Sequence, residues 1–156
     1  MSKTGLFVGG FFVAGLAVAS WQFFQPGSQP ASVAPSGAMV PEDTSSVEQG
    51  APIAVVQLPA QLSPKAELGK LAFEAKCAVC HGDNAAGQNG VAPPLVNRIY
   101  EPGHHSDEAF VSAAKNGVTS HHWEFGNMPK ITGLTRADVL YIARYVRELQ
   151  RENGIN

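Results

Sequence analysis

The chain has 156 residues, enough for one domain with flanking segments but short for two full domains. Its formal net charge is -2, and its 11 Lys and Arg residues form no run that would follow a phosphate backbone, so we expect no nucleic-acid partner. Its two cysteines, Cys77 and Cys80, have no second pair to complete a four-ligand structural zinc site.

Residues 1–24 are predicted to be a membrane anchor or a signal segment. Residues 6–24 are almost wholly apolar or glycine, which is just long enough to span a bilayer as a helix. Residues 17–19 form an Ala-Val-Ala cleavage pattern, but Trp21 and Phe24 continue the apolar character past it, as at a membrane interface. Either alternative sends the rest of the chain across the membrane. We favour an anchored domain in the periplasm over a soluble periplasmic protein cleaved near Ala19.

Residues 25–60 are predicted to be a flexible linker. Pro, Ser, Ala, Gly and Gln dominate this segment, which has no aromatic residue and no Lys or Arg. Its only charges are Glu42, Asp43 and Glu48. Such a composition buries too little apolar surface to offset the entropy lost on ordering.

Residues 61–156 are predicted to form an all-α domain. Ser63 followed by Pro64 is typical of a helix start, and this first helix is expected to end near residue 76. Ser106 is expected to cap a helix over residues 107–115, which Gly117 follows.

The last helix is predicted from a capping pattern and an apolar period. Thr135 and Asp138 resemble a capping box, and the helix is expected to reach about residue 151. Apolar residues recur behind the cap at helical spacing. No strand alternation is convincing in this part of the sequence.

The motif that carries chemistry is Cys77-Ala78-Val79-Cys80-His81, a C-x-x-C-H haem-attachment signature. Two cysteines three residues apart on a helical turn project to one side, where each thiol can add to a vinyl group of one haem. His81 is then placed to ligate the iron. A thioredoxin-like redox pair also has the C-x-x-C spacing, but it needs a strand before the motif, and a predicted helix stands there instead.

From this motif onward, residues 61–156 resemble the small class I cytochromes c. Gly82-Asp83 after the motif, and Pro93-Pro94-Leu95 further on, are similar to that family's loop. The resemblance implies the small cytochrome c fold, with three to five helices around one haem c bound covalently through Cys77 and Cys80. It also implies that the Pro93 carbonyl accepts a hydrogen bond from His81 Nδ1 and so orients the ligand.

The resemblance further implies a methionine as the second iron ligand. Asn127-Met128-Pro129 is similar to the family's distal loop, and a loop position is unusual for a methionine that merely fills a core. Trp123 lies where several bacterial members have a tryptophan that binds a haem propionate, and a plain core tryptophan is the open alternative.

Gly69 and Phe73 resemble the pattern of the family's first helix. Glycine permits another backbone to approach closely, and we expect the last helix to do so through Tyr141 or Tyr145. This feature is one of packing rather than chemistry.

Two histidine pairs have no role in the resemblance: His104-His105 and His121-His122. Three interpretations stay open for them. They are exposed loop residues, a peripheral copper or zinc site, or groups whose titration tunes the haem.

The function expected from these residues is one-electron transfer between membrane redox complexes, by a protein that is not an enzyme. Two alternatives remain: a haem subunit of a larger membrane oxidoreductase, and a peroxidase-like or gas-sensing cytochrome in which Met128 dissociates. Residues 61–156 hold ten Lys or Arg and ten Asp or Glu, so no strong charge steers a partner, and the donor and acceptor stay open.

Overall fold

The computed structural model describes residues 39–156. The predicted anchor, residues 1–24, and residues 25–38 of the predicted linker lie outside the described residues. The described part has four α-helices and two short 3-10 helices, with isolated bridges but no strand: α2 (Pro64–Lys76), α3 (Ala78–His81), η2 (Asp83–Ala85), η3 (Arg98–Tyr100), α4 (Asp107–Asn116) and α5 (Arg136–Glu152). The all-α prediction is confirmed.

The helix starts follow from local capping residues. Ser63 accepts a hydrogen bond from the Ala66 amide, and Pro64 is the first residue of α2. The capping box of Thr135 and Asp138 is present at the start of α5. Ser106 stands at the N-cap of α4, but its side chain makes no capping hydrogen bond, which differs from the expectation.

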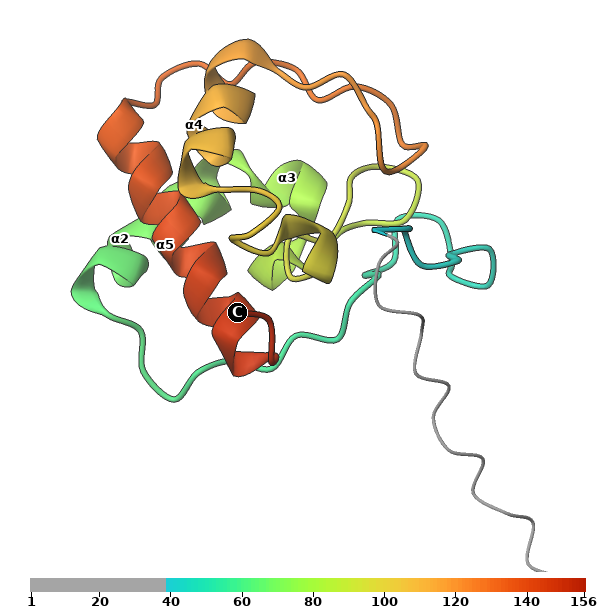
Figure 1. Ribbon diagram of the computed structural model, residues 1–156, viewed down its shortest axis with the longest axis horizontal. Helices are drawn as coiled ribbons and strands as arrows, with labels where there is room; N and C mark the ends of the chain where they lie inside the picture. The colour runs from blue at the N-terminus through green and yellow to red at the C-terminus, as the bar shows by residue number, and fades with distance from the viewer. Residues whose placement is uncertain (1–38) are drawn as a thin grey trace, which may run out of the picture. The chain divides into compact units, whose positions relative to one another are not determined.

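The long helix α5 packs against both α2 and α4, and the three form the frame of the domain (Figure 1). The crossing with α2 is close because Gly69 has no side chain. A Cβ built on Gly69 would lie 1.8 Å from the carbonyl oxygen of Tyr141, so the expected approach is through Tyr141. One turn further along, the Phe73 ring meets the Tyr145 ring at a centroid distance of 5.6 Å.

Because α2 and α5 cross so closely, Gly69→Ala is expected to lower the unfolding free energy. Alanine favours a helix interior by up to about 1 kcal/mol over glycine, so helix propensity alone predicts stabilisation. The clash is with a backbone oxygen that cannot rotate away, and overpacking typically costs about 1–3 kcal/mol, with backbone clashes at the upper end. We therefore expect a clear net loss of unfolding free energy, measured by denaturant unfolding of the haem-loaded protein.

Gly103→Ala is the matched control, because nothing lies within 4 Å of a Cβ at Gly103. Its unfolding free energy should stay within about 0.5 kcal/mol of the wild type. A Gly69→Ala protein more stable than the wild type would contradict the close approach of α2 and α5.

A small apolar core fills the space between α5 and the first half of the domain. It is extended by partly buried side chains, among them Leu62, Leu95 and Phe110. The cluster of buried residues is Ala66, Phe73, Ala85, Val96, Ile142, Tyr145, Val146 and Leu149. With so few large side chains, a bound prosthetic group would supply a substantial share of the apolar burial that a domain of this size needs.

Residues 39–60 lie on the domain, which differs from the flexible linker expected up to residue 60. The Asn89 side chain donates to the carbonyls of Thr44 and Val47, and the Ile53 and Ala54 amides donate to the Ala86 carbonyl. Near the end of the segment, Gln57 and Asn153 hydrogen-bond to each other through backbone and side-chain amide groups. We call residues 39–60 the N-terminal arm.

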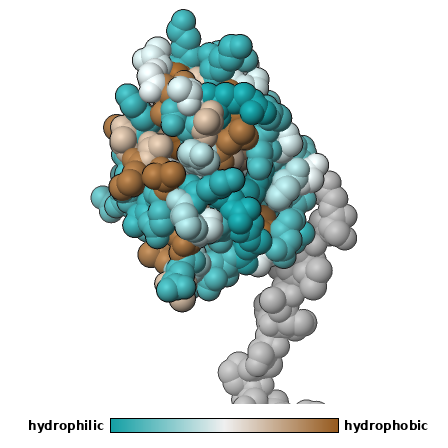
Figure 2. All heavy atoms as spheres, turned by 90° about the vertical axis from the view of Figure 1, so that its left-hand side faces the viewer, coloured by the Kyte–Doolittle hydropathy of each residue, from teal (hydrophilic) through white to brown (hydrophobic). Residues whose placement is uncertain are grey.

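The surface over the α2, α4 and α5 side is mainly hydrophilic, with hydrophobic side chains in several separate groups (Figure 2). Scattered apolar residues of this kind are normal on a protein surface. No helix within residues 39–156 is both long and apolar enough to cross a membrane.

Candidate haem-attachment site

The cysteine motif forms a tight turn directly after α2. Cys77 is the C-cap of α2 and the N-cap of α3, and its amide donates to the Phe73 carbonyl. Its own carbonyl accepts from the amides of both Cys80 and His81. Cys77 is half-buried, Cys80 is exposed, and both thiols are free of a disulfide. The turn therefore holds two thiols and an imidazole on one short piece of backbone.

His81 is buried and its ring is oriented by one hydrogen bond. Nδ1 lies 2.9 Å from the Pro93 carbonyl oxygen, the contact that the sequence resemblance implied. Burial lowers the pKa of His81, although the bond to Pro93 acts in the opposite direction. Since a carbonyl only accepts, Nδ1 carries the proton and the Nε2 lone pair is available to a metal.

Two glycines let the loop fold back under His81. Gly82 has φ +70°, and a Cβ there would lie 2.6 Å from the Gly87 carbonyl oxygen. A Cβ on Gly87 would lie 2.5 Å from the Pro94 nitrogen. The close packing of these segments brings Pro93 to His81, so both glycines serve the ligand orientation.

Gln88 supports the attachment turn, a role that sequence reasoning missed. Its side-chain amide donates to the carbonyls of Val79 and Cys80 at 3.0 and 3.1 Å, with a longer contact of 3.4 Å to Ala78. The Val79 and Cys80 carbonyls lie at the end of a helical turn and have no backbone partner, whereas the Ala78 carbonyl also accepts from the Gly82 amide. No sequence pattern links a glutamine to a motif eight residues earlier.

Met128 closes a loop that begins after α4. Its amide and carbonyl pair with those of Val118 at 3.0 and 2.9 Å, and the side chain is half-buried. A Cβ on Gly117 would lie 2.7 Å from the Met128 carbonyl oxygen, so glycine is needed for this pairing. We call residues 118–128 the methionine loop.

Trp123 lies within the methionine loop and is only 6% exposed. Its indole nitrogen is the one fully buried side-chain N or O atom of the described residues that makes no hydrogen bond of good geometry, although the Tyr100 hydroxyl faces it. An unpaired buried N–H is costly, and it indicates a site where a bound group supplies the acceptor.

The family model for cytochrome c matches residues 66–150, which is more than half of the chain. The chain belongs to the cytochrome c family. No curated protein and no solved structure matches it.

The residues of this cytochrome c fit a covalent haem c. The family's cofactor is attached through the C-x-x-C-H cysteines, which are Cys77 and Cys80 here. His81 offers a free Nε2 beside them, and Trp123 offers an unpaired N–H. When bound, the haem supplies one iron that accepts and releases a single electron.

The surroundings of the turn keep the Cys77 thiol in its neutral form. Burial and the neighbouring Cys80 raise the pKa of the Cys77 thiol to about 11, so the thiol is protonated at neutral pH. Cys77 and Cys80 would hold the haem through thioethers, each S–H adding across a vinyl C=C bond with its proton passing to a vinyl carbon. No oxidant or reductant is consumed in that addition.

The two histidine pairs, which the sequence left without a role, come together in space. His104 and His105 follow η3, while His121 and His122 belong to the methionine loop. The rings of His105 and His122 lie 5.4 Å apart between centroids. Their spacing along the sequence gave no sign of this arrangement.

Proposed function

We propose that this cytochrome c is a membrane-tethered one-electron carrier, with His81 and Met128 as its two iron ligands. The haem domain stands in the periplasm and passes electrons between membrane redox complexes, without acting as an enzyme. Electron transfer through haem c follows from membership of the family. The second ligand, the tether and the shuttling are the further parts of the proposal.

The observation that carries the proposal is the geometry of His81. The ring is buried, follows both cysteines directly, and is oriented by the Pro93 carbonyl at 2.9 Å. A ligand held in this way barely moves when the iron changes its charge, which favours rapid electron transfer over ligand exchange.

Met128 is the best candidate for the opposite ligand. Met39 is the other methionine of the described residues, and it lies in the N-terminal arm. The backbone of Met128, which carries the thioether side chain, is fixed to Val118 through both its amide and its carbonyl. A thioether opposite an imidazole favours the ferrous state and raises the reduction potential. Six-coordinate iron leaves no position for a substrate.

The indole of Trp123 supports the same assignment. Its unpaired N–H would be satisfied by a haem propionate, as the family resemblance implied. The Trp123 backbone carbonyl accepts from the Ser120 hydroxyl, which helps to fix the Trp123 backbone within the methionine loop. The same loop would then hold both an iron ligand and a propionate donor.

The exposed edge of the attachment turn is where a redox partner would meet the domain. Val79, between the two cysteines, is 77% exposed, and Cys80 beside it is also exposed. A small apolar contact of this kind suits a brief encounter rather than a permanent complex. Because residues 61–156 carry equal numbers of positive and negative side chains, the partner would be selected by the shape and polarity of the contact surface and not by net charge.

The proposed tether is short. Residues 25–38 separate the apolar segment from the N-terminal arm, and a chain of 14 residues spans at most about 50 Å. A haem domain on such a chain would stay close to the membrane, at a high effective concentration towards membrane complexes.

The test is membrane fractionation followed by a high-salt wash, which strips peripheral proteins but not spanning helices. We expect haem staining to stay in the membrane pellet. It should move to the soluble fraction when residues 1–24 are replaced by a cleavable signal peptide. Soluble haem protein in the wild type, with a mature N-terminus at Ser20, would refute the tether and leave a free periplasmic carrier.

A further inference from the structure

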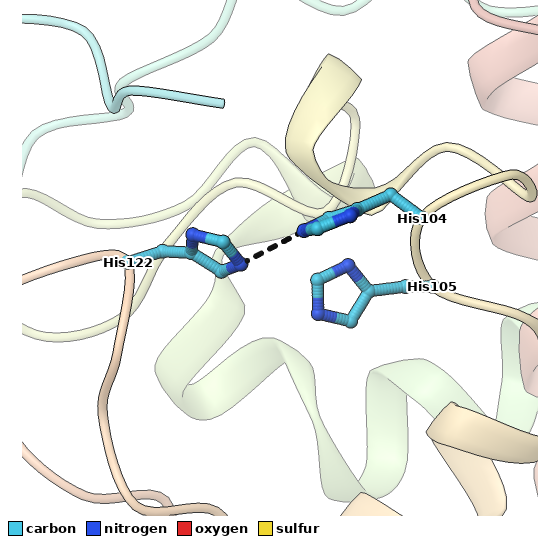
Figure 3. A group of neighbouring side chains, drawn as sticks. All are labelled: His104, His105 and His122. Atoms are coloured by element: carbon cyan, nitrogen blue, oxygen red, sulfur yellow. Dashed lines mark hydrogen bonds between the residues drawn. The ribbon is translucent and has the colours of Figure 1, made fainter. Parts of the chain in front are cut away.

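Three histidines from two separate loops form a cluster on the surface of this cytochrome c. His104 and His105 lie in the turn after η3, and His122 lies in the methionine loop. Their side chains point toward one another in Figure 3, and one potential ligand atom from each lies within 4.8 Å of the others. We call these three residues the histidine triad.

The spacing within the triad matches metal coordination. The Nε2 atoms of His104 and His122 are 3.2 Å apart. In a tetrahedral site with Zn–N bonds of about 2.0–2.1 Å, two ligand nitrogens are separated by about 3.3 Å. One pair is therefore already at the ligand–ligand distance. The potential ligand atom of His105 lies within 4.8 Å of the other two, so a small shift of the exposed His104 side chain would let all three reach one ion.

The hydrogen bond of His105 leaves one of its ring nitrogens free. Nδ1 lies 2.7 Å from the Ile99 carbonyl oxygen, so Nδ1 carries the proton. Its Nε2 is then left as an acceptor or a metal ligand. A ligating histidine usually has its second nitrogen bound in this way, because the bond fixes both the tautomer and the orientation of the ring.

The backbone under the triad is also fixed, by the buried Arg147 of α5. Its guanidinium donates to the carbonyls of Tyr100 and His105, and it pairs with Asp107 at 2.9 Å. The turn that presents His104 and His105 is thus held to the helical frame. A preformed turn loses little entropy when a ligand binds.

The alternative to a metal site is a surface cluster that is stabilised only by the hydrogen bond between His104 and His122. One bond between His104 and His122 satisfies one donor and one acceptor, and it leaves His105 Nε2 without a role. Partial burial and the facing imidazoles lower the pKa of both His105 and His122. Neutral imidazole is the form that binds metals, and the shifts of His105 and His122 favour that form.

We propose that His104, His105 and His122 bind one divalent transition-metal ion through imidazole nitrogens. Three imidazoles without a thiolate suit Zn²⁺ and Cu²⁺, and Cu²⁺ should bind more tightly. The site is distinct from His81 and joins the turn after η3 to the loop that carries Trp123 and Met128. A bound ion would therefore cross-link the two loops, whichever ligand stands opposite His81.

The test is calorimetric titration of Zn²⁺ into the ferric, haem-loaded full chain without an affinity tag. We expect one ion per chain. His122→Ala should weaken binding at least about 100-fold, because changes in the groups that only orient metal ligands already cost 10–100-fold. Its visible spectrum and metal-free thermal unfolding should match the wild type, which shows that the variant is folded.

His121→Ala is the matched control, since His121 is the neighbour of His122 and its Nδ1 lies 2.9 Å from the Thr119 carbonyl oxygen. It should bind Zn²⁺ within about threefold of the wild type. Absence of stoichiometric binding in the wild type would overturn the proposal. So would a His122→Ala protein that binds like the wild type, or a His121→Ala protein that loses as much affinity as His122→Ala.

Discussion

Replacing Cys77 and Cys80 together by serine should abolish covalent haem in this protein. Serine keeps the size and the backbone of the turn, but a hydroxyl does not form the thioether that each thiol forms with a vinyl group. The intact mass of the wild type should exceed that of the polypeptide by one haem, and acid–acetone should not extract it. The double variant should show the bare polypeptide mass.

Single variants and a matched control make this result specific. Cys77→Ser or Cys80→Ser alone leaves one thioether, so each should still retain haem, with a shifted absorption band. Val79→Ser places a hydroxyl in the same turn on a side chain that is 77% exposed, and it should retain haem as the wild type does. Haem that resists extraction from the double variant would disprove attachment through this motif.

The helices were predictable from sequence because their signals are local. Each helix start is predicted by residues within a four-residue window: Ser63 with Pro64 for α2, and Thr135 with Asp138 for α5. The structure has both starts. Gly69 was also predictable, since a glycine in a helix calls for a close neighbour. The bond from His81 to Pro93 was expected only because the family resemblance supplied it.

The N-terminal arm could not be predicted because composition does not reveal hydrogen-bond partners. The segment has few apolar side chains to bury, which argued for disorder. Its order comes instead from backbone groups that meet Ala86 and from the side-chain amides of Asn89 and Asn153. These partners stand 32 to 96 residues further along the chain, too far for any local pattern.

The supporting residues of the site were missed for the same reason. Gln88 holds the attachment turn, and Arg147 and Gln150 converge on the Tyr100 carbonyl from α5. Each is a common polar residue whose role depends on a tertiary contact. The histidine triad is similar, since two pairs separated by 16 residues meet only after the methionine loop has folded back.

Met128→Ala should convert a six-coordinate haem protein into one with an open or replaced sixth position. Alanine removes the thioether but leaves the backbone pairing with Val118 intact. The ferric protein should lose the weak near-infrared band of sulfur-to-iron ligation. The reduction potential should fall by at least about 100 mV, because the thioether stabilises ferrous iron. At 59 mV per tenfold change for one electron, this fall is about a 50-fold loss of preference for the ferrous state.

Carbon monoxide separates the carrier from the gas-sensing alternative. If Met128 is a firm ligand, the ferrous wild type should bind carbon monoxide slowly or not at all, whereas Met128→Ala should bind it readily. Met39→Ala is the matched control, because it removes the same thioether from the N-terminal arm and should keep the band and the potential. A band that persists in Met128→Ala would assign the iron to another ligand. Fast carbon monoxide binding by the wild type would mean that Met128 leaves the iron easily, and the protein would then be a ligand-binding cytochrome rather than a carrier.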